Sequence, residues 1–439
     1  SLPESKRYNN IVMNYYCRKS KSKYGIPQSE FSYDVLIKGI QFFEKFFGVP
    51  FPFEKWDFIM CPEFTVGAME FPGCVTFNDL KFIYEGDEVP AKINAYVVRV
   101  IIHEIAHMWF GNLVTMKWWD GLWLNESFAD FSAFLCLMKI HDKLAVQIED
   151  PIISIYSRKL WGYEEDSKST THPIACEICD TNKADSIFDG ITYSKGMATL
   201  MQLYHRIGFE QFSANLSNYM NEFKWKNTEM MDLFRHLENG IDSINMKEWI
   251  QEWLLSSGTN SMQPEWDLSK QGKQIMKIHQ GAVMDMHPTL RQHLFDMTFF
   301  NKEGNAVYNQ TVDVLNQEIS EIEIDNKDYA AVLLNSTDKG FIQVRLDDSS
   351  LEFFKKNLWK IGDYLMKSLL FEIFLGEIRQ GKLRADVLVN IVDQILTKTD
   401  LTNPKSSKIL MDLPLLLKKC FLYIPALFRT SLKYLDIDL

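Results

Sequence analysis

The sequence predicts an α+β protein built from several domains. Its 439 residues are more than one ordinary hydrophobic core supports. Apolar residues recur mainly at helical spacing over the first 255 positions, whereas they alternate with polar residues from Trp266 to Leu346. Beyond Ser349 the helical spacing returns. We therefore expect a mostly helical domain with a small mixed sheet, then a small β-sandwich, then a second helical domain.

The first domain is expected to combine short strands with long helices. In the first long helix, apolar residues such as Phe31, Val35 and Ile40 recur at helical spacing, and Pro50 then ends the pattern. A polar, basic linker over 18–23 precedes it. The expected elements are a strand over 11–17, a helix over 28–47, strands over 57–60 and 75–77, helices over about 91–110 and 124–140, and four helices near 194–207, 209–221, 228–239 and 245–255.

The later domains are delimited by the change in pattern. Residues 293–299 and 340–345 alternate between apolar and polar side chains, and 301–304 and 338–340 carry turn residues. Asp348–Ser350 is the expected cap of the helices that follow. The predicted domains are 1–25, a remnant of a preceding β domain with a linker, then 26–260, 261–347 and 348–439.

Composition and charge limit the partners. A net charge of −11 disfavours nucleic acid, which binds basic surfaces. The most apolar stretch, Leu413–Phe428, contains Lys418, Lys419 and Pro425, so no segment approaches the ~20 apolar residues of a membrane span. Without a signal pattern, cytoplasm is the default location. Because the sequence begins with Ser1 rather than Met, an extracellular or membrane-anchored location through a missing N-terminus is the alternative.

One short motif points to a metal site. His103 and His107 stand four apart in His-Glu-Ile-Ala-His, so on a helix both project from one face. Glu126, nineteen residues after His107, offers a third ligand, which leaves the fourth position to water. Two histidines and one carboxylate favour a single Zn²⁺ per chain. Glu104 lies beside the first histidine, where it can take a proton from that water. The pattern favours a metallopeptidase, and the alternative is a helix with two surface histidines.

Asp130 follows Glu126 by one helical turn. Histidines that bind a metal usually donate their second ring N–H to a carboxylate, which fixes tautomer and orientation. We therefore expect Asp130 to pair with His103 or His107. The alternative is an ordinary acid on a helix surface.

Longer stretches around these residues resemble the aminopeptidase N family of gluzincins, which includes the puromycin-sensitive aminopeptidases. The resemblance rests on His-Glu-Ile-Ala-His-Met-Trp-Phe-Gly-Asn-Leu-Val-Thr-Met at 103–116 and on Trp-Trp-Asp-Gly-Leu-Trp-Leu-Asn-Glu at 118–126. Gly-Ala-Met-Glu at 67–70 and Ile-Thr-Tyr-Ser-Lys-Gly at 191–196 match two further family motifs. It extends from about Ser1 to the C-terminal helices and implies a thermolysin-like catalytic domain and a superhelical C-terminal domain.

The resemblance implies a zinc aminopeptidase that removes the N-terminal residue of peptides with a free N-terminus, by zinc-activated water. By position, Glu104 would be the general base, Tyr193 would stabilise the oxyanion, and Glu70 would bind the substrate α-ammonium group. The remaining roles are zinc binding by His103, His107 and Glu126, and contact with the peptide backbone by Gly67, Ala68 and Met69.

The sequence also departs from the family pattern. Phe71 and Pro72 follow Gly-Ala-Met-Glu, where the family usually has Asn, so the polarity of the first subsite is expected to change. The resemblance implies that the chain retains only the last strand of the family's N-terminal β domain. For the same reason we expect a partial C-terminal helical domain, which ends at Leu439.

Other functions remain open. One is a catalytically impaired fragment or a peptide-binding interaction protein on the same fold. A thermolysin-like endopeptidase is disfavoured by Glu70, and the epoxide-hydrolase branch of the superfamily by Trp-Phe-Gly-Asn after His107. The preferred N-terminal side chain and the oligomeric state are not determined by the sequence.

Overall fold

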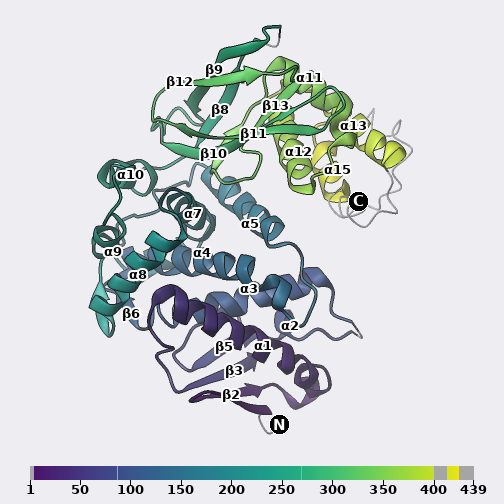
Figure 1. The fold of residues 1–439 in the computed structure, drawn as a ribbon. Coiled ribbons are helices and arrows are strands. Elements are labelled where there is room, and N and C mark those ends of the chain that lie inside the picture. Colours follow the sequence, from purple (N-terminus) through teal and green to yellow (C-terminus); the bar gives the residue numbers. More distant parts are fainter. Residues whose placement is uncertain (1–3, 87, 268, 400–412, 425–439) are drawn as a thin grey trace. The chain divides into compact units, whose positions relative to one another are not determined.

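The computed structural model describes residues 4–86, 88–267, 269–399 and 413–424 (Figure 1). The chain divides into two compact units, residues 1–257 and 258–439. The finer division into four domains stays a prediction.

The first unit contains a mixed five-stranded sheet in the order β1-β2-β3-β5-β4. The inner strands β2, β3 and β5 run parallel, and the edge strands β1 and β4 pair antiparallel to their neighbours. The predicted strands over 11–17, 57–60 and 75–77 are confirmed, and β1 and β2 of the predicted remnant belong to this sheet. The strands are β1 (Glu4–Tyr8), β2 (Ile11–Tyr16), β3 (Lys55–Cys61), β4 (Ala68–Met69) and β5 (Cys74–Asn78).

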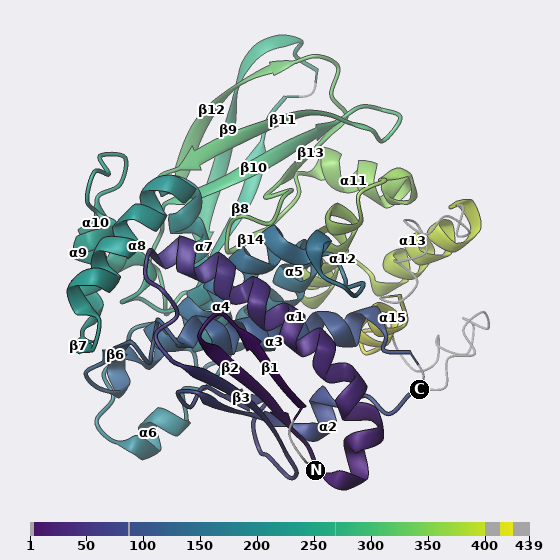
Figure 2. The ribbon, with the colours of Figure 1, turned by 60° about the horizontal axis from the view of Figure 1, so that its bottom comes forward.

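Helix α1 (Ser22–Phe47) lies along this sheet in both views (Figures 1 and 2). It begins six residues before the predicted start, and the predicted linker over 18–23 forms η1 (Lys19–Lys21) and the first turn of α1. Burial of Gly25 against Cys17 and Ile83 anchors these turns, so the helix continues through Pro27. Its other end is set by Gly48, which adopts φ +65°.

Two helices, α3 (Ala91–His107) and α4 (Leu122–Ile140), pack against each other in the middle of this unit (Figure 1). Both were predicted, although α3 ends three residues earlier than expected, in turns over 108–113. Almost every side chain of α4 is buried, as in a helix enclosed on all sides. Trp109 follows α3 and makes tilted or edge-on ring contacts with Phe43, Phe47 and Phe51. Its Nε1 donates a hydrogen bond to Val49 O at 2.8 Å.

Helix α5 (Pro151–Asp166) was not predicted. The side chain of Asp150 caps it and Pro151 occupies its first turn, which is a recognised start signal. Its buried face includes Lys159, Gly162 and Asp166, so burial along this helix does not follow the spacing of its apolar residues. The four predicted helices that follow are confirmed as α7 (Gly196–Ile207), α8 (Phe209–Phe223), α9 (Met230–Leu237) and α10 (Met246–Trp253). The other short elements are α2 (Asp79–Phe82), β6 (Val114–Met116), η2 (Trp119–Gly121), η3 (His141–Lys143), α6 (Thr181–Asp185), η4 (Ile191–Lys195) and β7 (Lys226–Thr228).

The second unit begins with two sheets, as the alternating pattern predicts. One sheet has the order β11-β10-β13 and the other β12-β9-β8-β14. Met276 and Ile278 from one sheet share a hydrophobic core with Phe295, Met297 and Phe299 from the other. The strands are β8 (Asn260–Glu265), β9 (Gly272–Ala282), β10 (His293–Phe300), β11 (Ala306–Val314), β12 (Ile319–Asn326), β13 (Ala331–Leu334) and β14 (Ile342–Val344).

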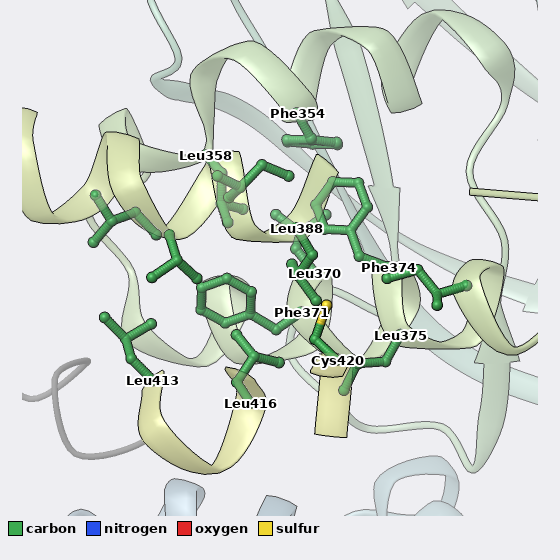
Figure 3. Packing of buried hydrophobic residues seen from close by; sticks show 14 of the residues in the cluster. Phe354, Leu358, Leu370, Phe371, Phe374, Leu375, Leu388, Leu413, Leu416 and Cys420 are labelled. Carbon is green, nitrogen blue, oxygen red and sulfur yellow. The ribbon is translucent and has the colours of Figure 1, made fainter. Parts of the chain in front are cut away.

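The helical pattern after Ser349 is confirmed for the described residues, whereas 400–412 and 425–439 lie outside them. Asp347 caps the first helix through hydrogen bonds from Ser349 N and Ser350 N, so the cap precedes the predicted one. Figure 3 shows a core shared by these helices. The elements are α11 (Asp348–Asn357), η5 (Leu358–Lys360), α12 (Tyr364–Arg379), α13 (Ala385–Lys398) and α15 (Leu413–Phe421). Within the described ranges, no helix is both long and apolar enough to cross a membrane.

Two tryptophans offer a matched test of the first unit's packing. Trp109 is fully buried, whereas Trp118 is 50% exposed, and each donates one hydrogen bond of 2.8 Å to a backbone carbonyl. We expect Trp109→Phe to lower the free energy of unfolding by about 2–4 kcal/mol, because it leaves a cavity and a buried carbonyl without a donor. Trp118→Phe is expected to cost less than about 1 kcal/mol, because water replaces its donor. Urea unfolding followed by circular dichroism measures both, and equal losses would contradict this account.

Candidate metal centre

Three predicted ligands converge where α3 meets α4. His103 and His107 lie in the last turns of α3, and Glu126 lies in the first turns of α4. The two Nε2 atoms are 3.0 Å apart, and Glu126 Oε2 lies 3.3 Å from His103 Nε2 and 3.6 Å from His107 Nε2. All three residues are buried, and their ligand atoms lie within 4.8 Å of one another.

The chemistry of these atoms fits a cation. His103 Nδ1 lies 2.9 Å from Asp130 Oδ1, and His107 Nδ1 lies 3.1 Å from Phe110 O. Both partners are acceptors, so in the neutral rings each Nδ1 carries the proton and each Nε2 presents a lone pair. Two lone pairs and a carboxylate facing one another repel unless a positive charge lies between them. Two imidazoles and one carboxylate are a donor set that Zn²⁺ prefers.

Without a metal, the surrounding carboxylates favour the protonated, positively charged forms of both histidines. Burial opposes protonation of His103, but the hydrogen bonds with Asp130 and Glu126 outweigh it and raise its pKa to about 9. Burial likewise opposes protonation of His107, yet Glu70 and Glu126 raise its pKa to about 10. Burial alone would raise the pKa of Glu126, whereas the two histidines lower it to about 2.

Asp130 lies behind His103 and is fully buried, and it contacts two partly buried arginines that the sequence did not single out. Arg158 places Nε and Nη2 each 2.7 Å from Oδ2, and Arg99 Nη1 lies 3.3 Å from Oδ1. Burial would raise the pKa of Asp130, but Arg158 and His103 hold it well below its usual range. Arg99 stands one turn before His103, a spacing that could have identified it. Arg158 comes from the unpredicted α5.

Glu104 and Glu70 lie on another side of the histidine pair. Burial raises the pKa of Glu104 to about 8 against the lowering effect of both histidines, and among the described residues its Oε2 has no hydrogen-bond partner. Glu70 Oε1 lies 3.7 Å from His107 Nδ1 and accepts a hydrogen bond from Asn125 Nδ2 at 3.3 Å. Asn112 Nδ2 donates to Glu70 O at 2.8 Å, which fixes the backbone of this segment.

Tyr193 projects from η4, a single turn of π-helix, a form that is rare and often found at functional sites. Its ring lies 6.3 Å from the His103 ring, and the Arg158 guanidinium lies 5.2 Å from its centre. Burial, followed by the charges of Glu126 and Asp130, raises the pKa of Tyr193 well above its usual value. The hydroxyl is therefore protonated at neutral pH and can donate a hydrogen bond.

The backbone around η4 explains why Tyr193 lies there. Asp189 Oδ1 accepts hydrogen bonds from the amides of Ile191 and Thr192 at 2.9 and 3.0 Å, which caps the start of the turn. At the other end, a Cβ on Gly196 would lie 1.9 Å from Ser127 Oγ. Only glycine therefore lets this segment approach α4 so closely.

A cavity of about 520 Å³ joins these groups. Its lining includes the predicted segment Gly67–Glu70, Glu104 and Tyr193, together with Asp130, Arg99 and Arg158. Phe71, expected to alter the first subsite, is 51% exposed and lies outside the lining that the described residues form. The structure thus brings the predicted site residues together, although their roles stay predictions.

Several known proteins are similar to this chain in sequence. The chain is 30% identical over 407 residues to aminopeptidase N of Streptomyces lividans, covering 89% of this chain and 46% of that protein. It is 38% identical over 238 residues to probable aminopeptidase 1 of Saccharolobus solfataricus, covering 54% and 29%. Over 348 residues it is 31% identical to tricorn protease-interacting factor F2 of Thermoplasma acidophilum, covering 79% and 42%. The chain therefore spans less than half the length of each of these relatives.

A protein-family match covers a much longer stretch of the chain than the individual motifs. Residues 31–253, just over half of the chain, match the Peptidase family M1 domain. This stretch contains both proposed ligand helices and η4. The resemblance to aminopeptidase N found from the motifs is thereby confirmed, and the chain belongs to peptidase family M1.

Proposed function

We propose that this chain carries the active site of a zinc-dependent aminopeptidase. The observation that carries the proposal is the position of Glu70, whose carboxylate lies 3.7 Å from the ring of the proposed ligand His107. A carboxylate beside the ring of a proposed ligand suits a substrate whose free α-ammonium group is adjacent to the scissile bond. The names of the relatives aminopeptidase N and probable aminopeptidase 1 support this substrate class.

His103, His107 and Glu126 would hold the zinc ion. When bound, zinc supplies a Lewis acid that polarises a carbonyl oxygen and lowers the pKa of a bound water to ~7. Asp130 orients His103 through the 2.9 Å contact with Nδ1 and keeps Nε2 free of a proton. The carbonyl of Phe110 does the same for His107 at 3.1 Å.

Three other side chains of the cavity have separate roles in the proposed reaction. Glu104 accepts a proton from the attacking water and returns it to the leaving amine. Tyr193 donates a hydrogen bond to the oxygen that gains charge at the scissile carbonyl. Glu70 pairs with the substrate α-ammonium group, and the extended segment Gly67–Met69 offers backbone groups to the peptide.

The proton-transfer role has a direct test. Glu104→Gln is expected to lower turnover of leucyl aminomethylcoumarin by about 10²–10⁴-fold, because the amide cannot accept the water's proton. Zinc content, measured by atomic absorption, is expected to stay at one ion per chain. Glu210→Gln on the exposed face of α8 is the control and is expected to leave both values unchanged. Turnover that persists in Glu104→Gln would refute the assignment.

The role of Glu70 predicts a requirement for a free amine. Acetylation of the substrate's N-terminus is expected to abolish hydrolysis, because it removes the charge that Glu70 binds. Glu70→Gln is expected to lower kcat/KM about tenfold to a hundredfold on free-amine substrates, the loss of one charge-assisted hydrogen bond. Equal rates on blocked and free substrates would show an endopeptidase-type site instead.

The metal site also predicts a pH-dependent stability. In the metal-free chain the pKa values of His103 and His107 are raised from 6.5 to about 9 and 10, so their protonation stabilises the fold. That stabilisation is complete below pH 6.5 and is lost as the pH rises through about 10. Burial raises the pKa of Glu104 from 4.5 to about 8, so its ionisation destabilises the fold further as the pH rises through this range.

Thermal unfolding between pH 6.5 and 10 measures this effect. We expect Tm of the metal-free chain to fall over this range more steeply than Tm of the zinc-loaded chain, whose histidines hold no extra proton to lose. His107→Gln in the metal-free chain is expected to flatten the slope. Parallel slopes for the metal-free and zinc-loaded chains would rule out these histidines as the ligands.

A further inference from the structure

One side of the cavity carries an excess of positive charge. Arg99 and Arg158 both line the cavity, and both guanidinium groups pair with the single carboxylate of Asp130. Arg158 binds Oδ2 through two nitrogens at 2.7 Å, whereas Arg99 makes one longer contact of 3.3 Å with Oδ1. His103 also shares Oδ1. Two cations against one anion leave one positive charge uncompensated.

The other acids of the cavity do not pair with this charge. Over the described ranges, Arg99 and Arg158 form ion pairs with Asp130 alone. Asp130 raises the pKa of Arg99 more than Glu104 does. Glu70 and Glu126 contact the histidines instead. The two guanidinium side chains are only 15% and 20% exposed. Each guanidinium also lies over an aromatic ring, Arg99 over Tyr96 and Arg158 over Trp161, but these rings carry no net charge. A partly buried cation without an anion of its own is costly, so this place favours an incoming anion.

The position of the pair along the cavity indicates which part of a substrate would reach it. Glu70 contacts His107, whereas Asp130 and its arginines lie behind His103. Tyr193 lies beside the pair, since the Arg158 guanidinium is 5.2 Å from its ring centre. A peptide with its amine at Glu70 and its scissile carbonyl at Tyr193 therefore extends its second residue toward Arg99 and Arg158.

We propose that Arg99 and Arg158 form a subsite for a carboxylate on the residue that follows the scissile bond. Guanidinium groups bind carboxylates through directed, charge-assisted hydrogen bonds. The carboxylate has two sources: the C-terminus of a dipeptide, or the side chain of Asp or Glu in the second position of a longer peptide. The inference rests on the proposed aminopeptidase function and specifies its substrate class.

Two pairs of substrates distinguish the sources. Leu-Asp-amide is compared with Leu-Asn-amide for a side-chain carboxylate, and Leu-Ala with Leu-Ala-amide for a terminal one. We expect the carboxylate member of at least one pair to be hydrolysed with a kcat/KM about tenfold higher or more, a difference of about 1.4 kcal/mol. A preference for Leu-Asp-amide identifies a side-chain carboxylate as the ligand, and a preference for Leu-Ala identifies a C-terminal one. Ratios near one in both pairs, with leucyl aminomethylcoumarin hydrolysed, would overturn the subsite but leave the aminopeptidase function intact.

Arg99 is the residue to change, because Arg158 and His103 still pair with Asp130 when it is removed. Arg99→Gln is expected to reduce the carboxylate preference at least threefold, and Arg99→Lys to retain most of it, since the charge remains. Arg235→Gln, on α9 and 58% exposed, removes the same charge outside the cavity and is expected to leave the preference unchanged. An undiminished preference in Arg99→Gln would contradict the assignment.

A binding measurement makes the test independent of turnover. Titration calorimetry on the Glu104→Gln chain compares Leu-Asp-amide with Leu-Asn-amide, and Leu-Ala with Leu-Ala-amide. We expect the carboxylate peptide of the preferred pair to bind about tenfold more tightly or more, and Arg99→Gln in this background to reduce the difference. Equal affinities in both pairs would overturn the subsite. If the unmodified chain hydrolyses none of these substrates while the affinities differ, the proposed enzymatic function fails and the anion subsite stands.

Discussion

The packing of α3 against α4 is the constraint on which the candidate site depends. It brings His103 and His107 from one helix to Glu126 and Asp130 from the other, and it buries all four side chains. The hydrophobic enclosure of α4 holds the two helices at this distance. Burying two carboxylates in such an interface is costly, but the histidines and the two arginines offset the cost at short range. The charges are therefore part of the helix packing rather than an addition to it.

The same interface orders charge along the cavity. The carboxylate of Glu70 lies near one histidine, and the guanidinium groups of Arg99 and Arg158 lie behind the other. A peptide bound by its N-terminus has the matching polarity, with its ammonium group first and any carboxylate later in the chain. Both arginines pair with Asp130, the carboxylate that orients His103. Orientation of a proposed ligand and selection of a substrate thus use the same three side chains.

The parts that sequence predicted are those determined by local spacing. Helical periodicity identified the two central helices, and the four-residue spacing of His103 and His107 placed both on one face. The start of α1 was missed because the polar, basic residues 18–23 were assigned to a linker, whereas close contacts of Gly25 with Cys17 and Ile83 hold these turns in place. Arg158 could not be found, since its helix shows little amphipathic pattern and its partner Asp130 is 28 residues away. The position of Tyr193 depends on Asp189 and on close contact of Gly196 with Ser127, which single-chain patterns do not reveal.

The cluster of His103, His107, Glu126 and Glu104 links metal binding to the stability of the fold. The two Nε2 atoms face each other at 3.0 Å, a distance that needs a proton or a cation between them, and Glu104 is buried with one carboxyl oxygen lacking any partner in the described part of the chain. A bound cation would relieve the first of these, because it occupies the point that all three donors face. Metal affinity and folding stability are therefore coupled here. Since Glu104 gains no protein partner, it stays available to a water or a substrate, and this part of the cavity gives up stability for reactivity.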